Sequence, residues 1–263
     1  MSKFIAGGCS FTLGNELSDD VDGKTPSKVS WAYGLKTGPS DEYVCTAFGG
    51  LGNPAIARRV FSAVANNTDI KCVVVMWSFL SRYDWAMPRH KSLENTRWTS
   101  ISPWDTNAGN EEALITLAGS ETQQEQWRTR RDTFAESGVK PFAEAIYKHA
   151  ANQYHETYLS WKSIIWLQNI LEKKKIPYMF TLADNTLFYN EFKQHKDQDT
   201  FMTALHDEIN FNNWYFFGER KMGFNQWAML EDYPRGTTHP LDEAHRDAVK
   251  LMLPTFKKLI GEK

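Results

Sequence analysis

The run Lys71-Cys72-Val73-Val74-Val75-Met76-Trp77 constrains the fold of this chain more than any other segment. Every residue after Lys71 is apolar, so the side chains on both faces of the predicted strand need to be covered. A strand of this kind is typical of the centre of a parallel sheet that has helices on both sides. Further short apolar runs predict strands at residues 3–6, 43–47 and 178–182.

Helical patterns lie between and after these runs. A short helix is expected around Trp31, and Asn53-Pro54 favours a helix start because Asn caps helices and Pro suits their first turn. One long helix is expected from about residue 142 to 175, and a last helix follows His239-Pro240. This alternation predicts an α/β fold in which helices cover both faces of a mostly parallel sheet.

The strand–helix pattern fails between about residues 78 and 140. A long irregular segment within a compact domain is usually a lid, a binding loop or a small subdomain. We therefore predict a single domain over residues 1–263 with an irregular Trp-rich insertion at about 78–140. Its tryptophans either stack on sugar rings or pack the insertion itself. They are Trp85, Trp98, Trp104 and Trp127.

Composition and charge narrow the classes of function. The formal net charge of −2 and the pI of about 6.4 give no reason to expect a nucleic-acid partner. No apolar run is long enough to span a bilayer and no signal peptide is visible, so a cytoplasmic protein without a membrane partner is expected. The three cysteines are widely spaced, which favours buried reduced thiols over disulfides. The oligomeric state stays open.

No cofactor and no metal site are expected. The pairs His239 with His245 and His149 with His155 lack the spacing and the companion ligands of a metal site. His245, which lies inside the last predicted helix, is instead expected to be a packing or hydrogen-bonding residue. The segment after the first strand also lacks the glycine patterns of nucleotide-binding loops, which disfavours a nucleotide-binding domain.

Ser10 is the strongest candidate for a reactive group. It lies in Gly7-Gly8-Cys9-Ser10-Phe11-Thr12-Leu13-Gly14, directly after the first predicted strand. Open α/β sheets bind ligands at the carboxyl ends of their strands, and flanking glycines allow a tight turn there. The alternatives are a serine that only caps the next helix and, less favoured, Cys9 as the nucleophile in place of a buried thiol.

His239 is the candidate base for Ser10. A serine hydroxyl needs a base to take its proton, and the segment before the last helix can bring His239 to the same rim of the sheet. The developing oxyanion needs hydrogen-bond donors, which the glycine loop after the second strand offers as backbone N–H groups and Asn53 offers as an amide. Together these residues predict acyl transfer.

The combined motifs resemble the SGNH (GDSL-like) hydrolases. Gly8-Cys9-Ser10-Phe11 is similar to the nucleophile turn of that family, Thr46-Ala47-Phe48-Gly49-Gly50-Leu51-Gly52-Asn53 to its glycine block, and His239-Pro240 to its C-terminal His-Pro. The openings Gly-Gly-Cys-Ser-Phe-Thr and Val-Val-Val-Met-Trp-Ser resemble, more closely, SGNH-type proteins encoded by tailed phages. The resemblance covers both ends and the first eighty residues, but not residues 86–230.

This resemblance implies both a fold and an activity. The fold is a three-layer α/β/α sandwich with a flavodoxin-like parallel sheet of about five strands. The activity is ester hydrolysis by a Ser–His–Asp triad, often of O-acetyl groups on carbohydrate, with Ser10 as the nucleophile. The N–H groups of Ser10 and Gly50 would hold the oxyanion.

The chain departs from the family at the acid of the triad. The family places an Asp three residues before its histidine, where this chain has Gly236. Asp232, Asp242 or Asp184 are candidate substitutes, although Asp242 is equally an acid in the first turn of the last helix. A Ser–His pair supported by a backbone carbonyl is the remaining alternative.

A second departure concerns the oxyanion site. The family's Gly-x-Asn-Asp block corresponds to Trp77-Ser78-Phe79-Leu80, which offers no side-chain amide. Asn53, Ser78 or Arg82 would therefore complete the site, unless Arg82 only pins a loop. The sequence predicts a serine esterase that removes a short acyl group from a carbohydrate or related ester. Its alternative is a non-catalytic carbohydrate-binding or assembly protein of the same fold, which Gly236 favours.

Overall fold

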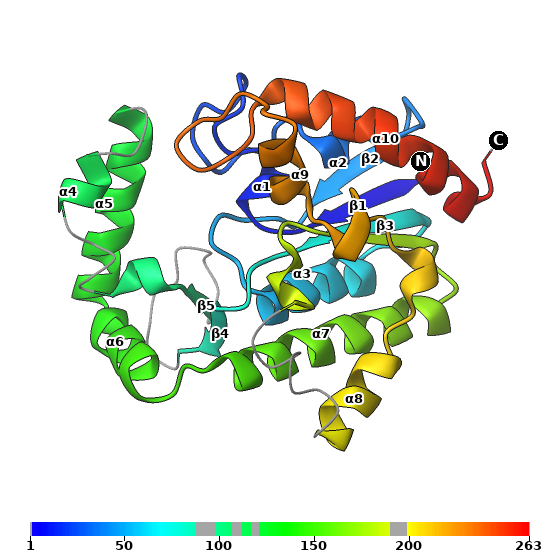
Figure 1. Ribbon diagram of the computed structural model, residues 1–263. Coiled ribbons are helices and arrows are strands. Elements are labelled where there is room, and N and C mark those ends of the chain that lie inside the picture. The colour runs from blue at the N-terminus through cyan, green and yellow to red at the C-terminus, as the bar shows by residue number, and fades with distance from the viewer. Residues whose placement is uncertain (1, 88–97, 107–111, 117–120, 190–198, 263) are drawn as a thin grey trace.

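The computed structural model describes residues 2–87, 98–106, 112–116, 121–189 and 199–262 (Figure 1). It contains a parallel sheet of four strands in the order β2-β1-β3-β6. These strands are β1 (Lys3–Gly7), β2 (Glu42–Cys45), β3 (Ile70–Trp77) and β6 (Tyr178–Leu182). All of them overlap the predicted runs, and the predicted α/β class with a parallel sheet is confirmed.

The sheet has one strand fewer than the family resemblance implies within the described residues. An extended segment does lie beside β6, where Trp214 forms a parallel bridge to Phe180 and the N–H of Tyr215 donates to the carbonyl of Phe180 at 2.8 Å. The ladder stops there because the N–H of Phe217 donates instead to the carbonyl of Met222. The fifth position of the sheet is therefore a single bridge.

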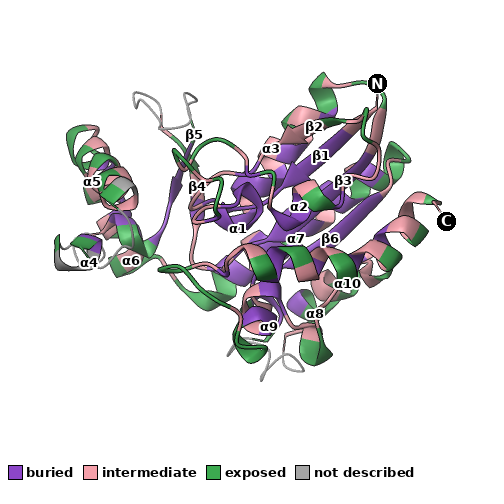
Figure 2. Cartoon of the chain, turned by 90° about the horizontal axis from the view of Figure 1, so that it is seen from above, coloured by how far each residue is buried: buried purple, intermediate pink, exposed green. Residues whose placement is uncertain are grey.

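Helices cover both faces of the sheet. In Figure 1, α3 (Asn53–Asn66) and α7 (Gln153–Lys173) lie below it, while α2 (Trp31–Gly34) and α10 (Asp242–Ile260) lie above it. After β6 the chain forms α8 (Thr200–Asp207), which lies at the lower edge in Figure 1, and then α9 (Phe224–Leu230). Central β3 is buried from Cys72 onwards, as its apolar sequence predicts (Figure 2). None of the described helices is both long and apolar enough to cross a bilayer.

The single long helix predicted for residues 142–175 is two helices. Helix α6 (Val139–His149) ends where the N–H groups of Ala150 and Ala151 both donate to the carbonyl of Ile146. Helix α7 begins anew because the side chain of Asn152 accepts the N–H of His155 at 2.9 Å. An N-cap of this kind starts a helix but leaves the apolar periodicity unbroken, so the periodicity hid the break.

The insertion predicted as irregular is instead ordered over its described residues. It contains the antiparallel pair β4 (Tyr83–Ala86) and β5 (Trp98–Ile101), then α4 (Glu112–Thr116) and α5 (Glu121–Glu136). Together with α6 it has its own apolar cluster, formed by Tyr83, Ile101, Phe134, Val139, Ala143 and Ile146. Its short strands and its mostly polar helix gave no clear periodicity, which explains the wrong prediction. Residues 88–97 of the predicted insertion lie outside the described residues.

Polar contacts join the insertion to the body of the protein. Arg58 of α3 makes a bidentate ion pair with Asp84 of β4, in which Nε and Nη2 donate to the two carboxylate oxygens at 2.8 and 3.0 Å. The hydroxyl of Tyr83 donates to Glu156 of α7 at 2.9 Å. Figure 1 shows the insertion at the carboxyl ends of the strands, on the same side as the short helix α1 (Ser10–Leu13). The insertion therefore stands next to the rim where Ser10 lies.

Candidate active site

Ser10 is the first residue of α1, immediately beyond the end of β1. The turn between them depends on Gly8, which has a φ of +156°; a Cβ there would lie 2.0 Å from Oγ1 of Thr12. Cys9 is the N-cap of α1, so the hydroxyl of Ser10 does not cap this helix. Ser10 is 8% exposed. The turn therefore presents a mostly shielded hydroxyl at the rim of the sheet.

The side chains of Ser10 and His239 are in direct contact. Oγ of Ser10 lies 2.7 Å from Nε2 of His239. The segment carrying His239 folds back on itself, because the N–H of Gly236 donates to the carbonyl of His239 and residues 235 and 240 form a bridge. The ring of Phe11 meets the imidazole edge-on with centroids 4.6 Å apart. The expected meeting of hydroxyl and imidazole is thus observed.

The carboxylate of Glu16 lies on the other side of the imidazole. Oε2 of Glu16 accepts the N–H groups of Thr238 at 3.1 Å and of His239 at 3.2 Å. Oε1 accepts the hydroxyl of Thr238 at 3.2 Å and lies 3.4 Å from Nδ1 of His239. The hydroxyl oxygen of Thr238 is itself 2.9 Å from Nδ1. A carboxylate, a hydroxyl, an imidazole and a serine thus form one continuous set of contacts.

Sequence reasoning missed Glu16. Its carboxylate lies next to Gly236, the position at which the resembled family has an Asp. A Cβ on Gly236 would lie 2.2 Å from Oε2 of Glu16, so the carboxylate occupies the space next to the glycine. Glu16 has a φ of +70°, and its N–H donates to the carboxylate of Asp20 at 2.9 Å. The only sequence signal was an acid six residues after Ser10 together with a bare glycine at 236, and no familiar spacing links the two.

Two of the three acids proposed from the sequence hydrogen-bond to groups other than the imidazole of His239. Asp242 accepts the N–H of Ser18 at 3.0 Å and its hydroxyl at 2.5 Å, so it holds the loop that contains Glu16 rather than the imidazole. Asp184 accepts the N–H of Thr186 as a helix cap. Asp232 is exposed on a residue with a φ of +55°. The contact with His239 that was expected of one of these three acids is made by Glu16.

The neighbours of Glu16 keep it charged. Partial burial by itself would raise the pKa of the Glu16 carboxyl. The hydrogen bond and the charge of His239, together with the N–H groups of Thr238 and His239, outweigh that effect and lower the pKa below its ordinary value. The carboxylate of Glu16 therefore carries its negative charge beside the ring of His239.

Two backbone N–H groups are available at the rim as anion donors. Ser10 lies in the first turn of α1, and Gly50 has a φ of +79°. Within the part of the chain that the structure describes, neither N–H donates a backbone hydrogen bond. The N–H of Phe48 donates to the carbonyl of Gly8 at 3.4 Å, which ties the glycine loop to the turn before Ser10. These contacts are compatible with the oxyanion role expected for Ser10 and Gly50.

The expected role of Asn53 as a side-chain oxyanion donor is corrected. Both hydrogens of its amide are used, since Nδ2 donates to the carbonyl of Ser78 at 3.1 Å and to the hydroxyl of Ser160 at 3.0 Å. Its Oδ1 accepts the N–H of Ser78 at 2.7 Å, and the residue is 1% exposed. Gly52, not Asn53, is the N-cap of α3. Asn53 is therefore a buried link between β3, α3 and α7.

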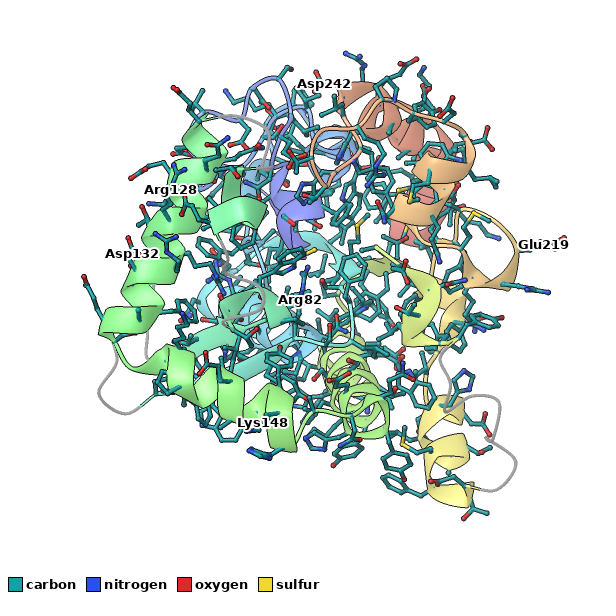
Figure 3. The ribbon with its side chains drawn as sticks, turned by 60° about the vertical axis from the view of Figure 1, so that its left-hand side comes forward. Arg82, Arg128, Asp132, Lys148, Glu219 and Asp242 are labelled. Carbon is teal, nitrogen blue, oxygen red and sulfur yellow. The ribbon has the colours of Figure 1, made fainter. Side chains whose placement is uncertain are left out.

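Arg82 pins the loops beside the site. Its Nη1 donates to the hydroxyl of Ser78 at 2.8 Å and to the carbonyl of Leu51 at 3.2 Å, and its guanidinium lies 5.0 Å from the ring of Phe79. Figure 3 shows Arg82 near the centre, between the insertion and the sheet, while Arg128 and Asp132 point outward from α5. The contacts of Ser78 and Arg82 thus match the loop-pinning alternative for Arg82.

The other titratable candidates from the sequence are His245 and the three cysteines. His245 is buried, and its Nδ1 accepts the N–H of Trp31 at 3.0 Å. Burial lowers the pKa of His245 from 6.5 to about 3, so this imidazole is neutral at neutral pH. Cys9, Cys45 and Cys72 are free; Cys9 and Cys72 are buried as expected, whereas Cys45 is only half-buried. Among the described residues, no group of three or more His, Cys, Asp and Glu is arranged to hold a metal ion.

The insertion reaches the glycine loop through Arg130. The guanidinium nitrogens of Arg130 lie 3.9 Å from where a Cβ on Gly50 would stand. Asp105 holds this guanidinium through contacts of 2.6 and 2.8 Å. Next to Asp105, Trp104 is 45% exposed, and its ring lies 6.0 Å from that of Trp127. The exposed indole of Trp104 is therefore adjacent in sequence to Asp105, whose partner Arg130 lies beside the glycine loop that contains Gly50.

Comparison with known proteins gives similarities of overall shape at low identity. No family model matches the chain, and no curated protein matches it. A lipolytic protein of the G-D-S-L family from Veillonella parvula is similar with 10% identity and a TM-score of 0.44, over 98% of this chain and 100% of that one. An acetyl xylan esterase from Butyrivibrio proteoclasticus is similar with 10% identity and a TM-score of 0.44, over 99% of this chain and 64% of that one. An extracellular lipase from Streptomyces rimosus is similar with 11% identity and a TM-score of 0.39, over 98% of this chain and 100% of that one. The assignment of chemistry depends on the contacts around Ser10 rather than on these similarities.

Proposed function

We propose that this protein is a serine esterase of SGNH type, with Ser10 as the nucleophile and His239 as the general base. The observation that carries the proposal is the 2.7 Å contact between Oγ of Ser10 and Nε2 of His239, which lie 229 positions apart in the chain. A serine hydroxyl at hydrogen-bond distance from an imidazole is the arrangement that activates serine for attack on an acyl group.

The reaction follows from the positions of these atoms. Nε2 of His239 takes the proton of Ser10 as Oγ attacks the ester carbonyl carbon, and the carbonyl oxygen becomes an oxyanion. His239 then gives that proton to the leaving alcohol as the ester C–O bond breaks, which leaves an acyl group on Ser10. Water, activated by His239, attacks this acyl-enzyme and releases the acid.

The oxyanion is held by the N–H groups of Ser10 and Gly50. Both belong to turns with glycine-dependent geometry, and both N–H groups are free of backbone acceptors within the described residues. Preorganised donors of this kind lower the barrier because they need no rearrangement when charge develops. The loop contacts of Arg82 with Leu51 and of Phe48 with Gly8 keep this part of the rim in place.

The substrate we propose is a short-chain ester, such as an acetyl group on a carbohydrate. Ser10 is 8% exposed, and the ring of Phe11 packs against the imidazole that contacts its hydroxyl, which suits a small acyl group. The insertion at the same rim carries exposed indoles, and aromatic faces of this kind stack on sugar rings. They are Trp85, Trp98 and Trp104, at 48%, 37% and 45% exposure.

Hydrolysis of 4-nitrophenyl acetate by the purified chain tests this function. We expect turnover by the unchanged protein, and loss of at least about a thousandfold in kcat for Ser10→Ala with an unchanged melting temperature. The matched control is Ser62→Ala on the exposed side of α3, which should keep full activity. Equal activity of Ser10→Ala and the unchanged protein would contradict the proposal.

The alternative, a non-catalytic carbohydrate-binding or assembly protein, was favoured by Gly236 in place of an acid. Gly236 no longer supports this alternative, because the carboxylate of Glu16 lies next to the glycine and beside His239. Binding of acetylated oligosaccharides without hydrolysis of any ester, together with no reaction toward a fluorophosphonate, would select the alternative.

A further inference from the structure

We propose that Glu16 is the positioning acid of this site, holding His239 in the orientation and tautomer that Ser10 requires, from a segment of the chain where sequence patterns place no such acid. This inference rests on the proposed hydrolase function. It adds a residue to the site and a reason for the glycine at 236. The argument uses the contacts, the shielding and the backbone geometry around Glu16.

The hydrogen bonds around Glu16 select one tautomer of His239. A separation of 3.4 Å between Oε1 and Nδ1 is long for a hydrogen bond, but the hydroxyl of Thr238 lies between the two groups at 3.2 and 2.9 Å. With a proton on Nδ1, the hydroxyl of Thr238 accepts from the ring and donates to Oε1. Nε2 then carries the lone pair that faces Oγ of Ser10, as a general base requires.

The site is shielded enough for the charge of Glu16 to matter. The side chains of Glu16 and His239 are 9% and 12% exposed. Attraction between opposite charges is much stronger away from bulk water. When His239 takes the proton of Ser10, the resulting imidazolium is stabilised by a carboxylate that its own contacts keep ionised.

The backbone is arranged to deliver this carboxylate. Glu16 is in the left-handed region at a φ of +70°, which costs a residue with a side chain on the order of 1 kcal/mol. Asp20 accepts the N–H of Glu16, and Asp242 fixes Ser18 two residues further on. A constrained residue whose carboxylate fills the space beside a glycine is expected if the carboxylate itself is needed there.

The test exchanges the position of the acid. The variants are Glu16→Gln, Glu16→Ala, Gly236→Asp and the double variant Glu16→Ala with Gly236→Asp. Asp232→Asn is the matched control, because it also turns an acid in the left-handed region into an amide. For each we would measure kcat and KM on 4-nitrophenyl acetate, the melting temperature, and the ¹⁵N shifts of the His239 ring.

We expect Glu16→Gln to lower kcat by about a hundredfold or more, with KM within about threefold and little change in melting temperature. The double variant should recover at least about tenfold over Glu16→Ala, because an Asp at 236 places a carboxylate in the vacated space. Asp232→Asn should match the unchanged protein. The ¹⁵N shifts should show the Nδ1-protonated ring in the unchanged protein and a tautomer mixture in Glu16→Ala.

The outcomes separate this inference from the proposed function. If Ser10→Ala abolishes hydrolysis but Glu16→Gln keeps full kcat and the ring tautomer is the same in every variant, the role of Glu16 is wrong and the hydrolase stands. If the unchanged protein hydrolyses no ester, the hydrolase proposal fails. The ¹⁵N shifts still decide whether Glu16 sets the tautomer of His239.

Discussion

A Cβ atom on Gly236 would lie 2.2 Å from Oε2 of Glu16, so the glycine and the carboxylate share one small volume beside His239. Glu16 follows the short helix that starts at Ser10, whereas Gly236 belongs to the segment before the last helix. The carboxylate and the imidazole thus come from opposite ends of the chain, and the missing side chain at 236 makes room for their contact.

Gly236→Ala is predicted to lower both stability and activity. The new methyl group would overlap Oε2 of Glu16 and push the carboxylate away from Thr238 and His239. Overpacking of this kind costs about 1–3 kcal/mol, and we expect kcat to fall at least about tenfold. Gly218→Ala is the control, because its Cβ would meet only the flexible side chain of Met222 at 3.3 Å. Urea unfolding and ester hydrolysis measure the two effects. Equal activity of Gly236→Ala and the control would be inconsistent with the position described for Glu16.

Asn53→Ala is predicted to affect stability far more than catalysis. The substitution leaves the N–H and carbonyl of Ser78 and the hydroxyl of Ser160 without their partner in a buried place, at a cost of about 2–4 kcal/mol. Because both amide hydrogens are used internally, kcat at a temperature where the variant is folded should fall by less than about fivefold. A drop of a hundredfold or more in kcat at unchanged stability would restore Asn53 as an oxyanion donor.

His245 is predicted to make the fold sensitive to acid. The pKa of His245 is lowered to about 3 in the folded state, from 6.5. As pH falls between these values the unfolded chain binds a proton that the folded chain does not, so stability falls by up to about 1.4 kcal/mol per pH unit from this group. Urea unfolding at pH 7 and pH 5 should show a shallower pH dependence for His245→Gln than for the unchanged protein. The exposed His149→Gln should leave that dependence as it was. Equal slopes for all three proteins would refute the assignment.

Trp104→Ala is predicted to affect carbohydrate esters selectively. Trp104 is exposed next to Asp105, whose partner Arg130 lies against the Gly50 loop. Loss of one stacking ring costs about 1 kcal/mol, so kcat/KM on an acetylated oligosaccharide should fall by about fivefold. Hydrolysis of 4-nitrophenyl acetate, which has no sugar, should stay the same. A parallel loss on both substrates would point to a structural role for Trp104 instead.

Sequence reasoning found the parts of this protein that depend on local patterns. The apolar run at residues 71–77 predicted the central strand, because a short continuous apolar run is typical of a strand buried on both faces. Ser10 and His239 were predicted from motifs at the two ends of the chain, and the structure brings them into contact. The insertion was predicted, but its strands and helices were missed because the strands are short and α5 is mostly polar. No periodicity marks such elements.

The acid was missed for a different reason. A carboxylate can approach an imidazole from any segment that the fold brings near, and the loop from Glu16 onward carried no pattern that linked it to Gly236. Asn53 was misassigned because the sequence shows that an amide is present but not where its hydrogens go. Three-dimensional contacts with Ser78 and Ser160 decide that.

The most direct test of the central claim is the site of covalent labelling by a fluorophosphonate, mapped by peptide mass spectrometry. The account predicts one adduct, on Ser10, that disappears in Ser10→Ala and forms at least about a hundredfold more slowly in His239→Ala. An adduct on any other residue, or none at all on the folded protein, would contradict it.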